Sequence, residues 1–186
     1  MVPVMALWLP ILVSAAIVFV ASSVIHMVLG FHKSDYHTVP AEDDVQAALR
    51  RFNLPPGDYQ LPCPGGPKDM QSQAFLDKMR KGPVIIMTVL GNGPMSMTKN
   101  LAMWFVYSVV VGLLSGYVAG VTLPVGASYR LVFRLVSTVA FTGYALALWQ
   151  IAIWYRRSWG TTIRSTIDGL VYALLTAGTF GWLWPR

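Results

Sequence analysis

Four long apolar stretches dominate the chain. They cover residues 4–31, 101–123, 130–155 and 163–184. Each has about the 20 residues that a helix needs to cross the hydrocarbon core of a bilayer. Asp168 is the one acidic residue within any of them. The pattern therefore predicts an all-α membrane bundle of four transmembrane helices.

The first stretch differs from a cleaved signal peptide. No Lys or Arg precedes Lys33, and the apolar run is longer than the apolar core of such a peptide. We therefore expect this stretch to be retained as the first transmembrane helix.

A polar segment, residues 33–100, separates the first two stretches and has its own pattern. Apolar side chains recur at helical spacing after Pro40, and residues 69–81 predict a second helix. Residues 58–61 and the β-branched run 84–90 are typical of short strands. The sequence therefore predicts a small soluble α+β insert between helices one and two.

Composition supports a membrane protein and argues against nucleic acid as a partner. Of 186 residues, 55% are hydrophobic and 12% are charged, against about 25% charged in a soluble domain. The net charge is +6, but the basic residues lie beside apolar stretches, where topology and anionic lipid headgroups account for them. The single cysteine, Cys63, excludes an internal disulfide.

The distribution of Lys and Arg predicts an orientation. The insert holds eight of the fourteen basic residues, and the short connection between the last two stretches holds Arg156 and Arg157. Basic residues favour the cytoplasmic side. We therefore expect a multi-pass protein of the inner (plasma) membrane, with a cytoplasmic insert and both termini outside.

Small residues recur every four positions in the second and fourth stretches, as in a glycine zipper. Such stripes allow two helix backbones to approach closely, either inside one chain or in a homo-oligomer. The sequence does not distinguish packing inside one chain from contact between copies. The stripe residues are Ser108, Gly112, Gly116, Gly120, Gly169, Ala173, Ala177 and Gly181.

Asp168 is the most unusual polar residue, because an ionised group inside a span is costly. Arg164 lies one helical turn earlier and could form a structural ion pair with it. Alternatively, Asp168 belongs to a site for an ion, a proton or a lipid headgroup, with Gln150 near the same side. Arg134 is a further polar residue inside a span, for which snorkelling to the headgroups is the simpler interpretation.

The three histidines are His26, His32 and His37, and Asp35 lies among them. Imidazole and carboxylate groups bind zinc and other transition metals, so His32 and His37 are candidate metal ligands. However, His26 and His32 are six residues apart, which does not place them on one helix face. The simpler interpretation is a set of hydrogen-bonded histidines at the membrane interface, and the alternative is a metal or acid–base site.

No nucleotide-binding, serine-hydrolase or redox motif occurs. Gly91-Asn92-Gly93 continues into Pro94 rather than into a phosphate-binding loop, and Cys63 has no second cysteine. The sequence therefore implies no particular cofactor.

The stretch from His32 to Tyr36 continues through Pro40 and Glu42, and Gly82-Pro83 follows later. Together with the four apolar stretches, these residues resemble a group of small uncharacterised bacterial four-span inner-membrane proteins. The resemblance implies the same architecture and location. It supplies no activity and no catalytic residue.

Three function hypotheses remain. The leading one is a non-catalytic oligomeric protein that acts in transport, in partner binding through the insert, or in envelope maintenance. The second is a small membrane enzyme that acts on a lipid-soluble substrate. The third is a narrow channel along an oligomer axis. The residues that could form the enzyme's site at the cytoplasmic interface are His26, His32, Asp35, His37 and Asp168.

Overall fold

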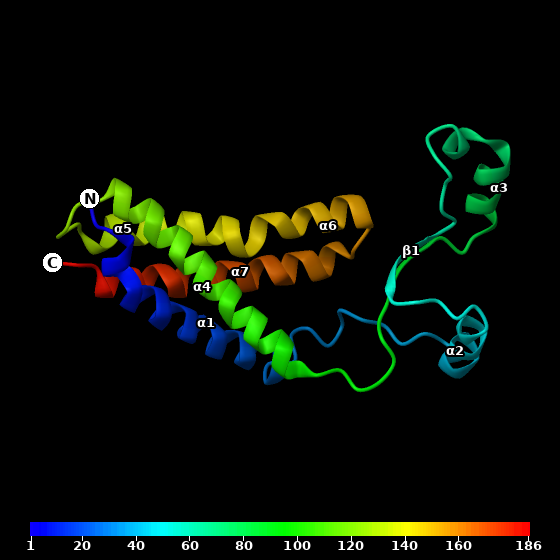
Figure 1. The fold of residues 1–186 in the computed structure, drawn as a ribbon, viewed down its shortest axis with the longest axis horizontal. Coiled ribbons are helices and arrows are strands. Elements are labelled where there is room, and N and C mark those ends of the chain that lie inside the picture. The colour runs from blue at the N-terminus through cyan, green and yellow to red at the C-terminus, as the bar shows by residue number, and fades with distance from the viewer. The chain divides into compact units, whose positions relative to one another are not determined.

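A computed structural model describes all 186 residues, and the chain divides into two compact units. The first unit comprises residues 1–36 and 96–186, and the second comprises residues 37–95. Figure 1 shows the elements of both.

The first unit is a bundle of helices. Its third long helix is continuous from Tyr129 to Tyr155 but contains a π-helical segment, η3. In such a segment each backbone hydrogen bond joins residues five apart, one more than in an α-helix. The elements in chain order are η1 (Val4–Leu7, a 3₁₀ turn), α1 (Trp8–Met27), α4 (Met97–Thr122), α5 (Tyr129–Phe141), η3 (Thr142–Leu146), α6 (Ala147–Tyr155) and α7 (Trp159–Leu183).

The helices of the bundle form a closed ring of neighbours. α1 packs against α4 and α7, and α5 packs against the same two helices. Both termini lie beside the connection between α4 and α5 (Figure 1). The Val2 N–H donates to the Gly120 carbonyl at 2.7 Å, and the Gly126 N–H donates to the Pro185 carbonyl at 2.9 Å. The ends of α1 and α6 therefore lie at the opposite end of the bundle.

Three segments are long and apolar enough to cross a membrane: Val4–Met27, Met97–Thr122 and Tyr129–Tyr155. The predictions of a mostly helical chain and of transmembrane helices are confirmed to this extent. The fourth predicted span, α7, is not among the three. It carries Arg164, Asp168 and several threonines, which lower its mean hydropathy.

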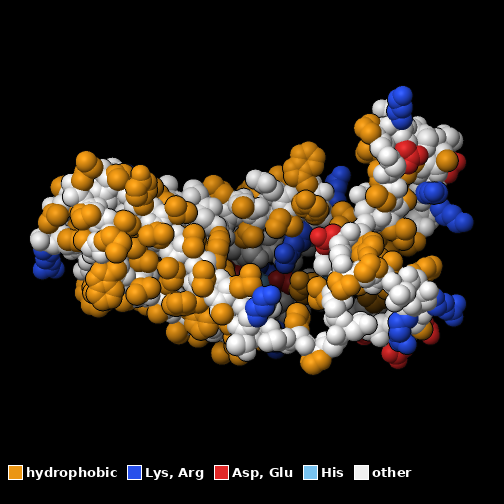
Figure 2. Space-filling model, viewed as in Figure 1, with side chains coloured by type: hydrophobic (Ala, Val, Ile, Leu, Met, Phe, Trp, Pro, Cys, Tyr) orange, Lys and Arg blue, Asp and Glu red, His pale blue; other side chains and the backbone are white.

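Polar and apolar side chains in the bundle are distributed as in a membrane protein. Ser14, Ser108, Ser115 and Thr176 are buried between the helices. Large apolar side chains point outward and cover much of the face in Figure 2. A lipid-facing bundle needs apolar residues outside and tolerates small polar residues inside, because lipid tails replace water as the solvent.

The first helix is shorter than the apolar stretch that predicted it. α1 ends at Met27 rather than at residue 31, and the chain then turns through Gly30, whose φ is +60°. Glycine adopts this left-handed conformation without steric cost. The turn redirects the chain, so that His32 lies back beside the end of α1.

The second unit has two short helices and one two-stranded sheet. α2 spans Glu42–Arg50 and α3 spans Gln73–Lys81. β1 (Gly57–Leu61) pairs with β2 (Ile85–Val89) in antiparallel register. The predicted α+β character of the insert is confirmed.

The second predicted helix starts later than residue 69. Residues 69–71 form a 3₁₀ turn, and α3 begins after Ser72. The Ser72 hydroxyl accepts a hydrogen bond from the Phe75 N–H at 3.2 Å. Serine at this position caps the helix and fixes its first turn.

Candidate functional site

His32 bridges two carboxylates that are distant in sequence. Its Nδ1 lies 2.7 Å from Asp35 Oδ2, and its Nε2 lies 2.7 Å from Asp168 Oδ2. The two carboxyl side chains are only 7% exposed and the imidazole is 13% exposed. Both contacts are satisfied when the imidazole is protonated at both nitrogens and donates twice.

Arg164 completes the pairing, but not with the acid that the sequence suggested. Its guanidinium donates to Asp35 Oδ1 through Nε at 2.9 Å and also through Nη2. The suggested Arg164–Asp168 ion pair is absent, because the turn after α1 places the Asp35 carboxylate beside Arg164. The polar cluster, defined here as His32, Asp35, Arg164 and Asp168, therefore ties this turn to α7.

The pKa of the Asp35 carboxyl lies below its ordinary value of 3.8. Burial of the group raises the pKa, because it disfavours the charged form. The hydrogen bonds and positive charges of His32 and Arg164 lower the pKa by more. Asp35 is thus held as a carboxylate that accepts three hydrogen bonds.

His26 lies against the polar cluster from the last turn of α1. Its ring and the His32 ring are 4.4 Å apart between centroids, with 31° between their planes. The only hydrogen-bond partner of its side chain is the Tyr172 hydroxyl, 3.5 Å from Nε2. Unlike the cluster, His26 is exposed. It is the most accessible ionisable group at this site.

A close helix contact holds Asp168 in place. A Cβ at the next residue, Gly169, would lie 2.9 Å from the Ala145 Cβ and 3.2 Å from the Tyr144 carbonyl oxygen. Only glycine allows η3 to approach α7 this closely. The close contact between η3 and Gly169 therefore fixes the position of α7, and with it Asp168, beside η3.

Three groups can share one ion. His26, His32 and Asp168 each offer a ligand atom, and these atoms lie within 4.8 Å of one another. Of the five residues suggested for a site at the interface, four lie close together in the first unit: His26, His32, Asp35 and Asp168. The fifth, His37, belongs to the second unit.

Two further predicted polar residues form no hydrogen bond or salt bridge with the polar cluster. Gln150 is exposed on α6 and makes no hydrogen bond with Asp168. Arg134 is exposed on α5 and makes no salt bridge. The interpretation of Arg134 as a snorkelling side chain suits this exposure.

The stripes of small residues are used for contacts inside the chain. Added Cβ atoms at Gly112 and Gly116 would meet Ile11 of α1 and Phe180 of α7. A Cβ at Gly120 would collide with the Val2 carbonyl, and one at Gly181 would lie 2.6 Å from the Tyr129 ring. These packing contacts need no second copy of the chain.

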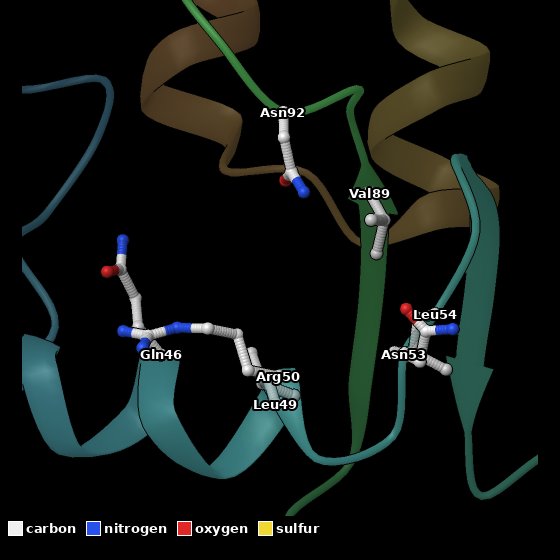
Figure 3. A pocket seen from close by; sticks show the side chains of 7 residues that line it. All are labelled: Gln46, Leu49, Arg50, Asn53, Leu54, Val89 and Asn92. Atoms are coloured by element: carbon white, nitrogen blue, oxygen red, sulfur yellow. The ribbon is translucent and has the colours of Figure 1, made fainter.

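A groove in the second unit is the other candidate site (Figure 3). It has a volume of about 470 Å³ and lies between α2, the loop that follows it, and β2. Its lining mixes apolar and polar side chains: Gln46, Leu49, Arg50, Asn53, Leu54, Val89 and Asn92. The sequence predicted the apolar stripe of α2 but not the groove, because its walls come from segments about 40 residues apart.

Comparison with known proteins gives no relative: no protein-family model, curated protein or solved structure matches the chain.

Proposed function

We propose that the chain is a non-catalytic, four-span membrane protein that presents its second unit to a protein partner. The bundle serves as the anchor. The polar cluster fixes the turn that leads from α1 toward the second unit.

The observation that carries this proposal is the small core of the second unit. Within residues 37–95 only Pro62 and Phe75 are buried, and α2 buries no side chain. Val45 and Leu49 of α2, and Phe52 just beyond its end, continue one apolar stripe, and all three are exposed. A two-stranded sheet with so little buried apolar surface is marginal by itself. Such a unit gains stability when a partner covers its apolar face.

The groove favours a protein partner over the membrane surface. Its apolar walls are Leu49, Leu54 and Val89, and Arg50 and Asn92 add directional hydrogen-bonding groups. Six basic and six acidic residues in the unit cancel in charge, whereas attraction to anionic lipid needs an excess of basic residues. An apolar protein segment with an acidic or amide group opposite Arg50 fits this lining.

We include α7 as the fourth span because of how its side chains are arranged. Ile163, Ile167, Leu170 and Leu174 are exposed on its outer face. Its polar residues, by contrast, include the buried Thr161, Thr162, Asp168, Thr176 and Thr179. A helix can therefore present an apolar surface to lipid even when its mean hydropathy is low.

With four spans, the charge distribution supports a cytoplasmic second unit. Lys33, Lys99, Arg156 and Arg157 belong to the end of the bundle where α1 and α6 end. This basic end faces the cytoplasm under the positive-inside rule. Both termini would then lie outside, in a bacterial inner membrane.

Photo-crosslinking in the native membrane tests the partner. A benzoylphenylalanine at Leu49, in the groove, should give one discrete adduct, and Arg50→Glu in the same chain should reduce its yield. The control carries the crosslinker at Asp77, an exposed position outside the groove. The same adducts from both positions, or none from Leu49, would contradict the proposal. An adduct with a second copy would indicate self-assembly instead.

A second candidate function is a small membrane enzyme that acts on an interfacial, lipid-soluble substrate. It is favoured by the exposed His26 beside a buried carboxylate–imidazole–carboxylate array, because such an array can position an acid–base group. The test is turnover of a panel of phospholipid and ester analogues in liposomes. Turnover lost in His26→Ala but kept in His37→Ala would support an enzyme. No turnover across the panel would count against it.

A further inference from the structure

We propose that His26, His32 and Asp168 bind a zinc ion. The proposal concerns binding alone. It uses the site of the second candidate function, but it stands whether or not that site is catalytic.

The three donor groups are of the kinds that bind zinc. Two imidazole nitrogens and one carboxylate oxygen lie within 4.8 Å of one another, on the last turn of α1, the turn that follows it, and α7. Zinc sites with an open position use three protein ligands of these kinds. His37, which the sequence also suggested as a ligand, lies outside this set.

The groups behind the donors hold the His32 ring in an orientation that suits a metal ligand. Asp35 Oδ2 accepts from His32 Nδ1 at 2.7 Å, and this contact turns Nε2 toward Asp168. Histidines that bind a metal commonly donate their other N–H to a carboxylate, which fixes the ring and its tautomer. Arg164 in turn holds the Asp35 carboxylate. The chain thus supplies an outer layer of contacts that a simple pair of surface histidines lacks.

The charges around Asp168 also favour a cation at this position. Arg164 and His32 both face Asp35, whereas no Lys or Arg pairs with Asp168. The Asp168 side chain is nevertheless buried, with only 7% of its surface exposed. When zinc occupies the position between His32 Nε2 and Asp168, the dication takes over the compensation of this buried carboxylate.

The rearrangement that zinc requires is small. With zinc–ligand bonds of about 2.0–2.2 Å, ligand atoms around a tetrahedral ion lie roughly 3.3 Å apart. The His32 Nε2 to Asp168 Oδ2 distance must open from 2.7 Å, and the His26 donor must move closer. His26 is the exposed donor, and a single hydrogen bond restrains its side chain, the 3.5 Å contact with the Tyr172 hydroxyl, besides its packing against the His32 ring. Its exposed side leaves the fourth position for water.

Isothermal titration calorimetry tests the proposal: the full chain, stripped of metal and held in detergent, is titrated with Zn²⁺. We expect one zinc per chain. Co²⁺ in place of Zn²⁺ should give the strong visible absorption of a four-coordinate ion, which reports the geometry independently of affinity.

His26→Ala is the main variant, because His26 takes no part in the Asp35–His32–Asp168 contacts and its loss leaves them intact. It should lose the stoichiometric site and the cobalt absorption, while His37→Ala keeps both. Asp35→Asn should weaken zinc binding by about 10–100-fold without abolishing it, because it removes support and not a ligand. Asp168→Asn should lose the site.

Three results would overturn the proposal: no stoichiometric uptake by the wild-type chain, equal binding by His26→Ala and wild type, or loss of binding in His37→Ala. None of these depends on the groove of the second unit. The failure of zinc binding and the failure of the partner proposal are therefore separate outcomes.

Discussion

Asp168 and His32 show what single residues do in this protein. A carboxylate buried between helices is costly unless something compensates its charge. His32 supplies that compensation from a position 136 residues away in the chain. Removal of one member of such a pair leaves the other buried without a partner, which costs more than the pair contributes.

His32→Ala should therefore destabilise the bundle. We expect the free energy of unfolding to fall by about 3 kcal/mol, because both Asp35 and Asp168 lose a partner. Chemical denaturation in detergent micelles measures this change. His37→Ala is the matched control and should leave the stability unchanged. Equal stability of both variants and wild type would mean that the cluster does not hold the turn to α7.

Asp35→Asn should produce a stability defect that depends on pH. The pKa of Asp35 is lowered in the folded chain, so its stabilising contribution is complete above the ordinary value of 3.8 and is lost as the pH falls through the lowered value. The stability difference between wild type and Asp35→Asn should be largest at neutral pH and shrink below about pH 4. Thermal unfolding of both proteins across this range measures the effect, and a constant difference would contradict it.

At the scale of helices and strands, local pattern predicted the elements well but not their contacts. The apolar stretches and the pattern of the insert predicted the helices and strands. However, α4 and α7 each begin four residues before the predicted starts at 101 and 163, and α1 ends four residues early, at Met27. Gly30 was the signal for that end, because its left-handed conformation suits a turn. The π-helical segment and the Asp35–Arg164 pair have no local signal, because both depend on which helices become neighbours.

Gly169→Ala should disturb the contact between η3 and α7. The new methyl group would lie 2.9 Å from Ala145 Cβ, and overpacking of this kind costs about 1–3 kcal/mol. Gly178→Ala on the same helix is the control, since its Cβ would meet only the Tyr129 hydroxyl at 3.7 Å. Unfolding in detergent compares the two. Equal stability would show that η3 can move away from α7.

Gly116 illustrates why the stripe alone does not identify an oligomer. A large residue there would collide with Phe180, which already lies 3.1 Å from the position of an added Cβ. Gly116→Leu should therefore fail to fold whether or not copies of the chain associate. Self-assembly is better tested on the wild-type chain, by counting its subunits with native mass spectrometry.

At the scale of the whole molecule, the chain combines an apolar bundle with a second unit that has almost no core of its own. Three spans follow from length and hydropathy. The fourth rests on the outward apolar face of α7 and on the basic end of the bundle. Mean hydropathy could not identify it, since the polar side chains that lower the mean include those that face the interior.

The most direct measurement is the accessibility of single cysteines to a maleimide that does not cross membranes, in right-side-out and inverted vesicles. Cys63 is exposed in the second unit and serves as a native probe. Three further probes, each in a Cys63→Ser background, are Val125→Cys between α4 and α5, Ser158→Cys before α7, and Arg186→Cys after it.

If the four helices span the membrane with the second unit in the cytoplasm, Cys63 and the Ser158→Cys probe are labelled only from the cytoplasmic side. The Val125→Cys and Arg186→Cys probes are then labelled only from outside. Labelling of the Val125→Cys and Arg186→Cys probes from opposite sides would show that α7 does not cross the membrane. That result would contradict the four-span bundle and the orientation on which the proposed role of the second unit depends.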